Sequence, residues 1–166
     1  MIRAAVFDLG GVLEIVDDDR WLAEWVARWQ GLELDEAHAR ERQADFWNAY
    51  CGVLDEPLRD FVRELRDTLI VASLSNSADG AREEEERRYG FDELFDERVY
   101  SHEIGVQKPD AGIYRYTQEL LGVEPHEIVF LDDRQSAVDG ARLAGWHAVL
   151  HESTPTSIAA IRALLT

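Results

Sequence analysis

Lys108 is the only lysine in the chain, and every other strongly basic side chain is an arginine. The two residues are interchangeable on a solvated surface but not at a binding site. Lysine is a compact point charge that suits a single phosphate or carboxylate oxygen, whereas arginine presents a wide planar fork. An isolated lysine before Pro109 could be a compositional accident. The acidic and hydroxyl residues elsewhere in the sequence favour a binding site for a phosphate or carboxylate.

Acidic and hydroxyl side chains stand where short apolar runs of the sequence end. Asp8 follows the first run, Ser75 closes the second, and Asp132 and Asp133 close the third. Each has a structural interpretation as a turn residue or helix cap. Together, carboxylates without a cysteine or histidine cluster suit Mg²⁺, and Lys108 would supply charge for a phosphate. Asp8 is then a candidate nucleophile that forms an aspartyl-phosphate, while the metal and Lys108 spread the developing charge.

The elements that must position these residues alternate between strand and helix. Short apolar runs predict strands, and segments with a helical apolar period or helix-ending signals predict helices between them. This alternation predicts an α/β domain with a mostly parallel sheet, in which ligands bind beyond the carboxyl ends of the strands. The predicted strands are 2–7, 69–74, 98–100, 127–131 and 147–150, and the predicted helices are 57–66, 109–121 and 133–144.

Two further helices are predicted at 20–30 and 35–50, with no strand between them. They follow directly on the first strand, which indicates an appendage to the sheet. We therefore predict a core made of residues 1–16 and 56–166 and a truncated helical cap at 17–55. The acidic run 83–86 is interpreted as a solvated helix face.

Four ordered segments resemble the motifs of the haloacid dehalogenase-like (HAD) hydrolase superfamily. They are 6–13 (VFDLGGVL), 74–76 (LSN), 105–110 (GVQKPD) and 130–133 (FLDD), and 137–145 resembles the helix that follows the last motif. The resemblance covers roughly residues 1–16 and 65–150, and order, spacing and strand context agree. It implies a three-layer Rossmann-like core with a helical cap inserted after the first strand.

The resemblance also implies a Mg²⁺-dependent phosphatase and a role for each motif residue. Asp8 would be the nucleophile and a metal ligand, Lys108 would bridge nucleophile and phosphate, and Ser75 with the backbone of Asn76 would hold the phosphate. The remaining Mg²⁺ ligands would be the backbone carbonyl of Gly10, Asp132 and Asp133.

Three departures from the phosphatase pattern bear on activity. Gly10 replaces the usual second aspartate, the general acid and base, although a subgroup resembling sugar-phosphate phosphatases also has glycine here. General acid–base catalysis contributes about 10²–10⁴-fold, so turnover should be slow or confined to good leaving groups. Ala137 replaces a frequent Asn or Asp and removes a supporting contact. The cap holds two helices where four are usual, which implies an open site or a cap completed by a partner.

The cap is rich in aromatic residues. Trp21, Trp25 and Trp29 recur every four residues on one helix face, and Phe46, Trp47 and Tyr50 lie on the next helix. The favoured interpretation is a small core between the helices and the sheet. The alternative is a substrate platform or a homodimer interface.

Two other functions stay open. A catalytically degenerate HAD-fold binding or scaffold protein is suggested by Gly10 and Ala137 and opposed by Lys108 and the intact acids. A metal-free dehalogenase would resemble this chain at Ser75, Asn76 and Lys108, but it would lack paired acids such as Asp132 and Asp133.

The composition of the chain limits the classes of molecule that it is expected to bind. The formal net charge of −17 disfavours nucleic acid and anionic membranes, and a small phosphorylated molecule is the expected substrate. The one cysteine, Cys51, excludes an internal disulfide and is interpreted as an inert thiol. No signal-peptide pattern or membrane-length apolar run is present, so we expect a soluble, cytoplasmic protein.

Overall fold

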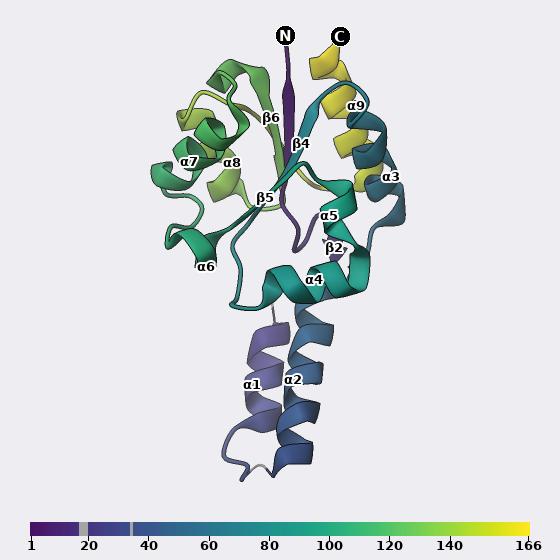
Figure 1. The fold of residues 1–166 in the computed structure, drawn as a ribbon, viewed down its shortest axis with the longest axis vertical. Coiled ribbons are helices and arrows are strands. Elements are labelled where there is room, and N and C mark those ends of the chain that lie inside the picture. The colour runs from purple at the N-terminus through teal and green to yellow at the C-terminus, as the bar shows by residue number, and fades with distance from the viewer. Residues whose placement is uncertain (17–19, 34) are drawn as a thin grey trace.

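A five-stranded parallel sheet forms the centre of the molecule, in the order β5-β4-β1-β6-β7 (Figure 1). The computed structural model describes residues 1–16, 20–33 and 35–166. Each predicted strand is present, which confirms the α/β fold class. The strands are β1 (Ala4–Phe7), β4 (Ile70–Ser75), β5 (Glu97–Tyr100), β6 (Ile128–Asp132) and β7 (His147–Leu150).

Helices cover both faces of the sheet, with α7 and α8 on one side and α3 and α9 on the other (Figure 1). Because successive strand residues point to opposite faces, β1 serves two hydrophobic clusters: Phe7 packs with the first and Val6 with the second. The helices of the core are α3 (Glu56–Leu65), α4 (Ala81–Tyr89), α5 (Phe91–Leu94), α6 (Ser101–Ile104), α7 (Ala111–Leu121), α8 (Gln135–Leu143) and α9 (Thr154–Leu165), with a 3₁₀ turn at Pro125–Glu127.

A helical hairpin, α1 (Trp21–Trp29) and α2 (Glu36–Cys51), projects beyond the edge at which the parallel strands end (Figure 1). The short antiparallel pair β2 (Glu14–Ile15) and β3 (Val53–Leu54) joins it to the core. This pair was not predicted, because two-residue strands leave no periodic signal. The two predicted cap helices are present, and the exact division of the chain into 17–55 and the core stays a prediction, since residue 17 lies outside the described residues.

Two helices of the core begin two residues later than predicted. Helix α7 starts at Ala111 rather than Pro109, because the Asp110 carboxylate accepts the Gly112 N–H at 2.7 Å and caps the helix there. Helix α8 starts at Gln135 rather than Asp133. The second correction matters for function, since it leaves Asp133 in the loop that follows β6.

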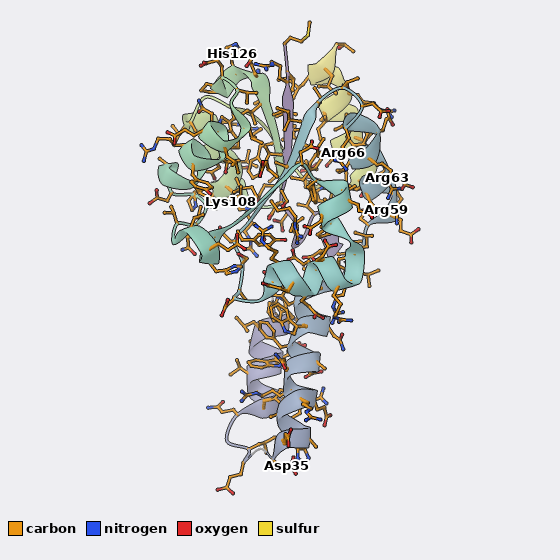
Figure 2. The ribbon with its side chains drawn as sticks, viewed as in Figure 1. Asp35, Arg59, Arg63, Arg66, Lys108 and His126 are labelled. Atoms are coloured by element: carbon orange, nitrogen blue, oxygen red, sulfur yellow. The ribbon has the colours of Figure 1, made fainter. Side chains whose placement is uncertain are left out.

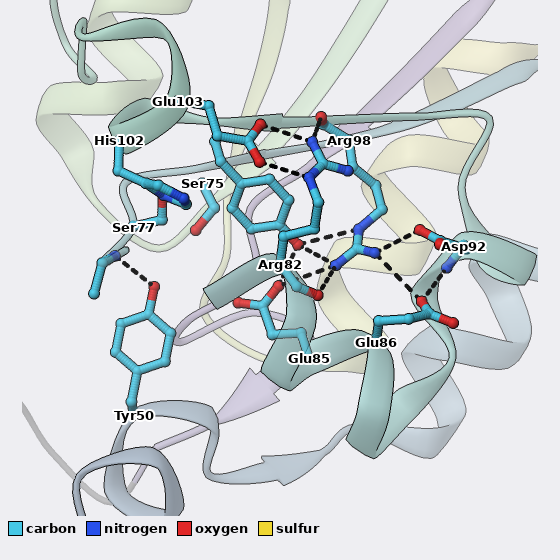
Figure 3. Close-up of polar contacts among 12 residues, drawn as sticks. Tyr50, Ser75, Ser77, Arg82, Glu85, Glu86, Asp92, Arg98, His102 and Glu103 are labelled. Carbon is cyan, nitrogen blue, oxygen red and sulfur yellow. Dashed lines mark hydrogen bonds and ion pairs between the residues drawn. The ribbon is translucent and has the colours of Figure 1, made fainter. Parts of the chain in front are cut away.

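The acidic run 83–86 is not only a solvated face, and that prediction was wrong for Glu85. Helix α4 crosses the end of the sheet and buries Ala81 and Glu85, which are one helical turn apart. The Tyr100 hydroxyl donates to Glu85, and the guanidinium of Arg98 lies 2.6 Å from Asp92 (Figure 3).

Burial raises the pKa of Glu85 to about 7, from an ordinary value of 4.5. Between these values the folded state binds more protons than the unfolded state, so this group destabilises the fold progressively as pH rises through that window. Glu85→Gln removes the penalty. We expect the free energy of unfolding of the wild type, relative to Glu85→Gln, to fall by about 2–3 kcal/mol between pH 4.5 and pH 8.

Urea unfolding at both pH values measures this difference. Glu83→Gln is the matched control, because it makes the same change at an exposed position of the same helix. A wild type and a Glu85→Gln variant with the same pH dependence would contradict the expectation.

Candidate active site

The predicted site residues meet at one cleft of about 420 Å³, at the carboxyl ends of the parallel strands. Asp8 follows β1, Ser75 ends β4 and Asp132 ends β6, so three adjacent strands deliver them to the same edge. Lys108 comes from the loop before α7 and lies inside the α/β body, whereas Arg63 points outward from α3 (Figure 2). The cleft is also lined by Gly10, Gly11, Asn76, Asp133 and Ala137.

Lys108 is buried at the centre of this arrangement. Its Nζ lies 2.8 Å from Asp8 Oδ1 and 2.6 Å from Asp132 Oδ2, and it donates to the Leu74 carbonyl at 2.8 Å. Burial alone would lower the pKa of the ammonium group, but the two carboxylates outweigh it and the pKa is raised. The side chain is therefore a fixed positive charge next to the candidate nucleophile.

Asn76 has a positioning role that the sequence did not reveal. Its side-chain amide donates to the Lys108 carbonyl at 3.0 Å, and its Oδ1 accepts the Lys108 N–H at 2.8 Å. This reciprocal pair clamps the loop that carries Lys108 to the end of β4. Because this pair of hydrogen bonds engages only the side chain of Asn76, its backbone N–H stays available for the predicted contact with a phosphate.

Asp8 is buried, and one of its two carboxylate oxygens is already engaged. Oδ1 accepts the Leu9 N–H at 2.8 Å and faces Lys108. Burial raises the pKa of Asp8 to about 7; Lys108 opposes this shift, and Asp132 adds to it. A further cation at this site would favour the ionised carboxylate.

Three carboxylates fit a divalent cation. Asp8, Asp132 and Asp133 each offer one oxygen, and these atoms lie within 4.8 Å of one another. Asp132 accepts hydrogen bonds from the Lys108 ammonium and from the Arg134 N–H. The buried Asp133 Oδ1, in contrast, has no hydrogen-bond partner among the described residues. An orphaned carboxylate oxygen beside like charges is costly unless a cation is shared, and Mg²⁺ takes oxygen ligands.

The two glycines after the nucleophile differ in the space around them. A Cβ at Gly11, where φ is +81°, would lie 2.4 Å from Asp133 Oδ2, so any side chain there would displace a candidate metal ligand. A Cβ at the exposed Gly10 would meet nothing within 4 Å. The structure therefore leaves room for a side chain at the position of the missing aspartate.

A family model of the haloacid dehalogenase-like hydrolases matches residues 14–145. This chain belongs to that family. The match begins after Asp8, but Asp8 stands at the end of the central strand beside the other motif residues, as the resemblance implied.

Individual HAD relatives include proteins named for two different chemistries. A protein named as a phosphatase from Mycobacterium tuberculosis is 30% identical, over 90% of this chain and 87% of the relative. A protein named (S)-2-haloacid dehalogenase 4A from Burkholderia cepacia is 25% identical, over 89% and 82%. A variant HAD family enzyme from Bacteroides thetaiotaomicron, solved with magnesium and inorganic phosphate, superposes with a TM-score of 0.76 at 20% identity, over 92% of this chain and 95% of that one.

Five aromatic residues of the cap contact one another between α1 and α2, and whether they form a core, a substrate platform or a dimer interface stays a prediction; they are Trp21, Trp25, Phe46, Trp47 and Tyr50. Phe46 packs edge-on against Trp21 at 5.6 Å and Trp25 at 5.2 Å between ring centroids. Trp47 and Tyr50 also pack against the main hydrophobic core, and Trp21 and Tyr50 line the cleft. Burial raises the pKa of the Cys51 thiol, which agrees with its interpretation as an inert group. Among the described residues, no helix is long and apolar enough to cross a membrane.

Proposed function

We propose that this HAD hydrolase is a Mg²⁺-dependent phosphatase that cleaves a phosphate monoester through an aspartyl-phosphate on Asp8. The observation that carries the proposal is Lys108, held by Asp132 against Asp8, beside an oxygen of Asp133 that has no partner among the residues the structure describes. Asp8, Asp133, Asp132 and the Gly10 carbonyl would hold the metal. When bound, Mg²⁺ would offset the negative charge of the phosphoryl group.

The chain's own residues suit a two-step displacement. The second oxygen of Asp8 attacks phosphorus, and the bond to the ester oxygen breaks with its electron pair, so that the leaving alkoxide takes a proton from solvent. Water then attacks the phosphorus, loses its proton, and releases inorganic phosphate and the Asp8 carboxylate. Lys108 stabilises the charge of the transferring group in both steps.

The surroundings of Ser75 support its proposed role in holding the phosphate. Its side chain is almost fully buried yet lines the cleft, and among the described residues its hydroxyl has only a long contact, 3.4 Å, with the Asn76 carbonyl. A contact of that length is weak, so the hydroxyl can donate to a phosphate oxygen instead. The Asn76 N–H would provide a second donor.

A metal-free dehalogenase is the second candidate, because a relative bears that name. The cluster of Asp8, Asp132 and Asp133 disfavours it, since the single ammonium of Lys108 leaves excess negative charge there. A panel of phosphate monoesters and 2-haloacids separates the two, with phosphate and chloride release as readouts and Asp8→Asn as the blank. We expect phosphate release alone. Chloride release would overturn the proposal, and the absence of both products would favour the degenerate scaffold.

Lys108→Arg tests whether the site needs a compact charge. The substitution keeps the charge but places a wide guanidinium where Nζ contacts Asp8, Asp132 and the Leu74 carbonyl at once. We expect kcat/KM for an aryl phosphate to fall at least about tenfold, which is about 1.4 kcal/mol of transition-state stabilisation. Arg115→Lys, an exposed exchange on α7, is the control. Unchanged kinetics for Lys108→Arg would show that the site does not require a lysine, and that its presence here is an accident of composition.

A further inference from the structure

One wall of the active-site cleft contains a buried acid that the proposed chemistry does not use. Glu14, on β2, lines the cleft on the cap side together with Val16, Trp21 and Tyr50. Its side chain is almost completely buried, with 1% of the residue exposed. Its Oε1 has no hydrogen-bond partner among the described residues. Buried carboxyl groups are ordinarily paired, so an unpartnered oxygen in the wall of a cleft marks a place where a bound molecule could supply the partner.

A second buried acid, Glu85, lies near Glu14, behind the residues that line the cleft. Glu85 receives a hydrogen bond from Tyr100 on one oxygen, while its other oxygen, Oε1, has no partner in the described part of the chain and points away from Arg98, towards the side of Tyr50 (Figure 3). The pKa of Glu14 is raised well above its usual value by burial, then by Glu85 and by Asp8; Arg88 and Arg98 only partly oppose this. Glu14 therefore holds its proton more tightly than an ordinary glutamate while the cleft is empty, and a cation that enters beside it would favour the ionised carboxylate.

The rest of that wall is aromatic. Trp21 and Tyr50 meet edge to face, with ring centroids 5.9 Å apart, and both line the cleft. Aromatic faces attract alkylammonium groups by roughly 0.5–2 kcal/mol. Among the described residues that line the cleft, the cationic side chains, Lys108 and Arg134, belong to the core side. In the part of the chain that the structure describes, the cap wall therefore combines one buried carboxyl group with aromatic rings and contributes no basic side chain.

We propose that this wall binds an ammonium group on the substrate's leaving group, which makes phosphate esters of amino alcohols the substrate class. The inference rests on the proposed function for the position of the phosphate, near Lys108 and Ser75. The two ends of the cleft then match the two charges of such an ester. Neutral polyol esters would fill the same space but offer no positive charge to Glu14.

A matched pair of substrates tests the proposal by turnover. Phosphocholine and 3,3-dimethylbutyl phosphate have nearly the same shape, but only the first is cationic. We expect kcat/KM to favour phosphocholine at least about tenfold in the wild type, and Glu14→Gln to remove most of that preference. A wild type that does not distinguish the pair would overturn the inference. So would a Glu14→Gln variant that slows both esters equally, since that result assigns Glu14 to proton delivery instead.

Binding of the alcohols alone tests the same wall without turnover. Choline and 3,3-dimethylbutanol are titrated at constant ionic strength while the tryptophan fluorescence of the full-length protein is followed. We expect choline to bind at least about tenfold more tightly, Tyr50→Phe to retain this difference because it keeps the ring, and Tyr50→Leu and Glu14→Gln to reduce it. Circular dichroism confirms that each variant is folded.

The two readouts separate failure of the inference from failure of the proposed function. Selective choline binding without phosphate release would support the ammonium site and overturn the phosphatase. Release of phosphate from an aryl ester, with choline and its neutral analogue bound equally, would support the phosphatase and overturn the ammonium site.

Discussion

Replacing Asp8 with asparagine is expected to lower phosphate release from an aryl phosphate by more than about 1,000-fold. An amide cannot attack phosphorus, yet it nearly matches the carboxylate in shape and can still accept the Leu9 N–H. Burial also raises the pKa of the Asp8 carboxyl, so losing its charge should not cost the fold. Initial rates at saturating Mg²⁺, together with thermal unfolding of both proteins, measure the two effects.

Asp67→Asn is the matched control for this experiment. It makes the same chemical change at an exposed position between α3 and β4, at the opposite end of the sheet from the cleft. It should release phosphate at the wild-type rate. Wild-type turnover by folded Asp8→Asn would show that Asp8 is not the nucleophile, and the phosphatase mechanism would then fail.

The second large effect is a gain of function. Gly10→Asp places a carboxyl group two residues after the nucleophile, where it can protonate a leaving alkoxide. Aryl phosphates need little protonation as they leave, whereas alkyl phosphates need much more. We therefore expect the alkyl-to-aryl ratio of kcat/KM to rise in Gly10→Asp, by up to the 10²–10⁴-fold range of general acid catalysis. The cleft accommodates the change, because a Cβ at Gly10 meets nothing within 4 Å.

Gly10→Asn is the matched control, since it has the same size and no proton to give at neutral pH. Its alkyl-to-aryl ratio should stay at the wild-type value. A folded Gly10→Asp with an unchanged ratio would mean that proton delivery does not limit this site, and that solvent or another group already supplies the proton.

The sheet and the floor of the site could be predicted because their signals are local. Each core strand is a short apolar run, and Asp8, Ser75 and Asp132 stand where such runs end. Parallel strands with helical connections bring their carboxyl ends to one edge, so local pattern alone places these side chains together. Their catalytic roles remain proposals that the variants above address.

The contacts that tune the site could not be predicted, because they join segments far apart in the chain. The Asn76–Lys108 clamp spans 32 positions, and neither side chain has a local feature that pairs it with the other. Glu85 stands among glutamates that are more exposed, and only the placement of α4 against the sheet buries it. Glu14 is in a two-residue strand, too short for a periodic pattern, and its place in the cleft depends on how the cap folds back.

The most direct test of the central claim is the metal dependence of aryl phosphate hydrolysis. The purified protein is treated with EDTA, and the release of p-nitrophenol from p-nitrophenyl phosphate is followed as Mg²⁺ is added back. We expect almost no turnover in EDTA, saturable recovery with Mg²⁺, and a much weaker response in Asp133→Asn, which alters a candidate metal ligand. Full turnover in EDTA that added Mg²⁺ does not change would contradict a metal-dependent phosphatase.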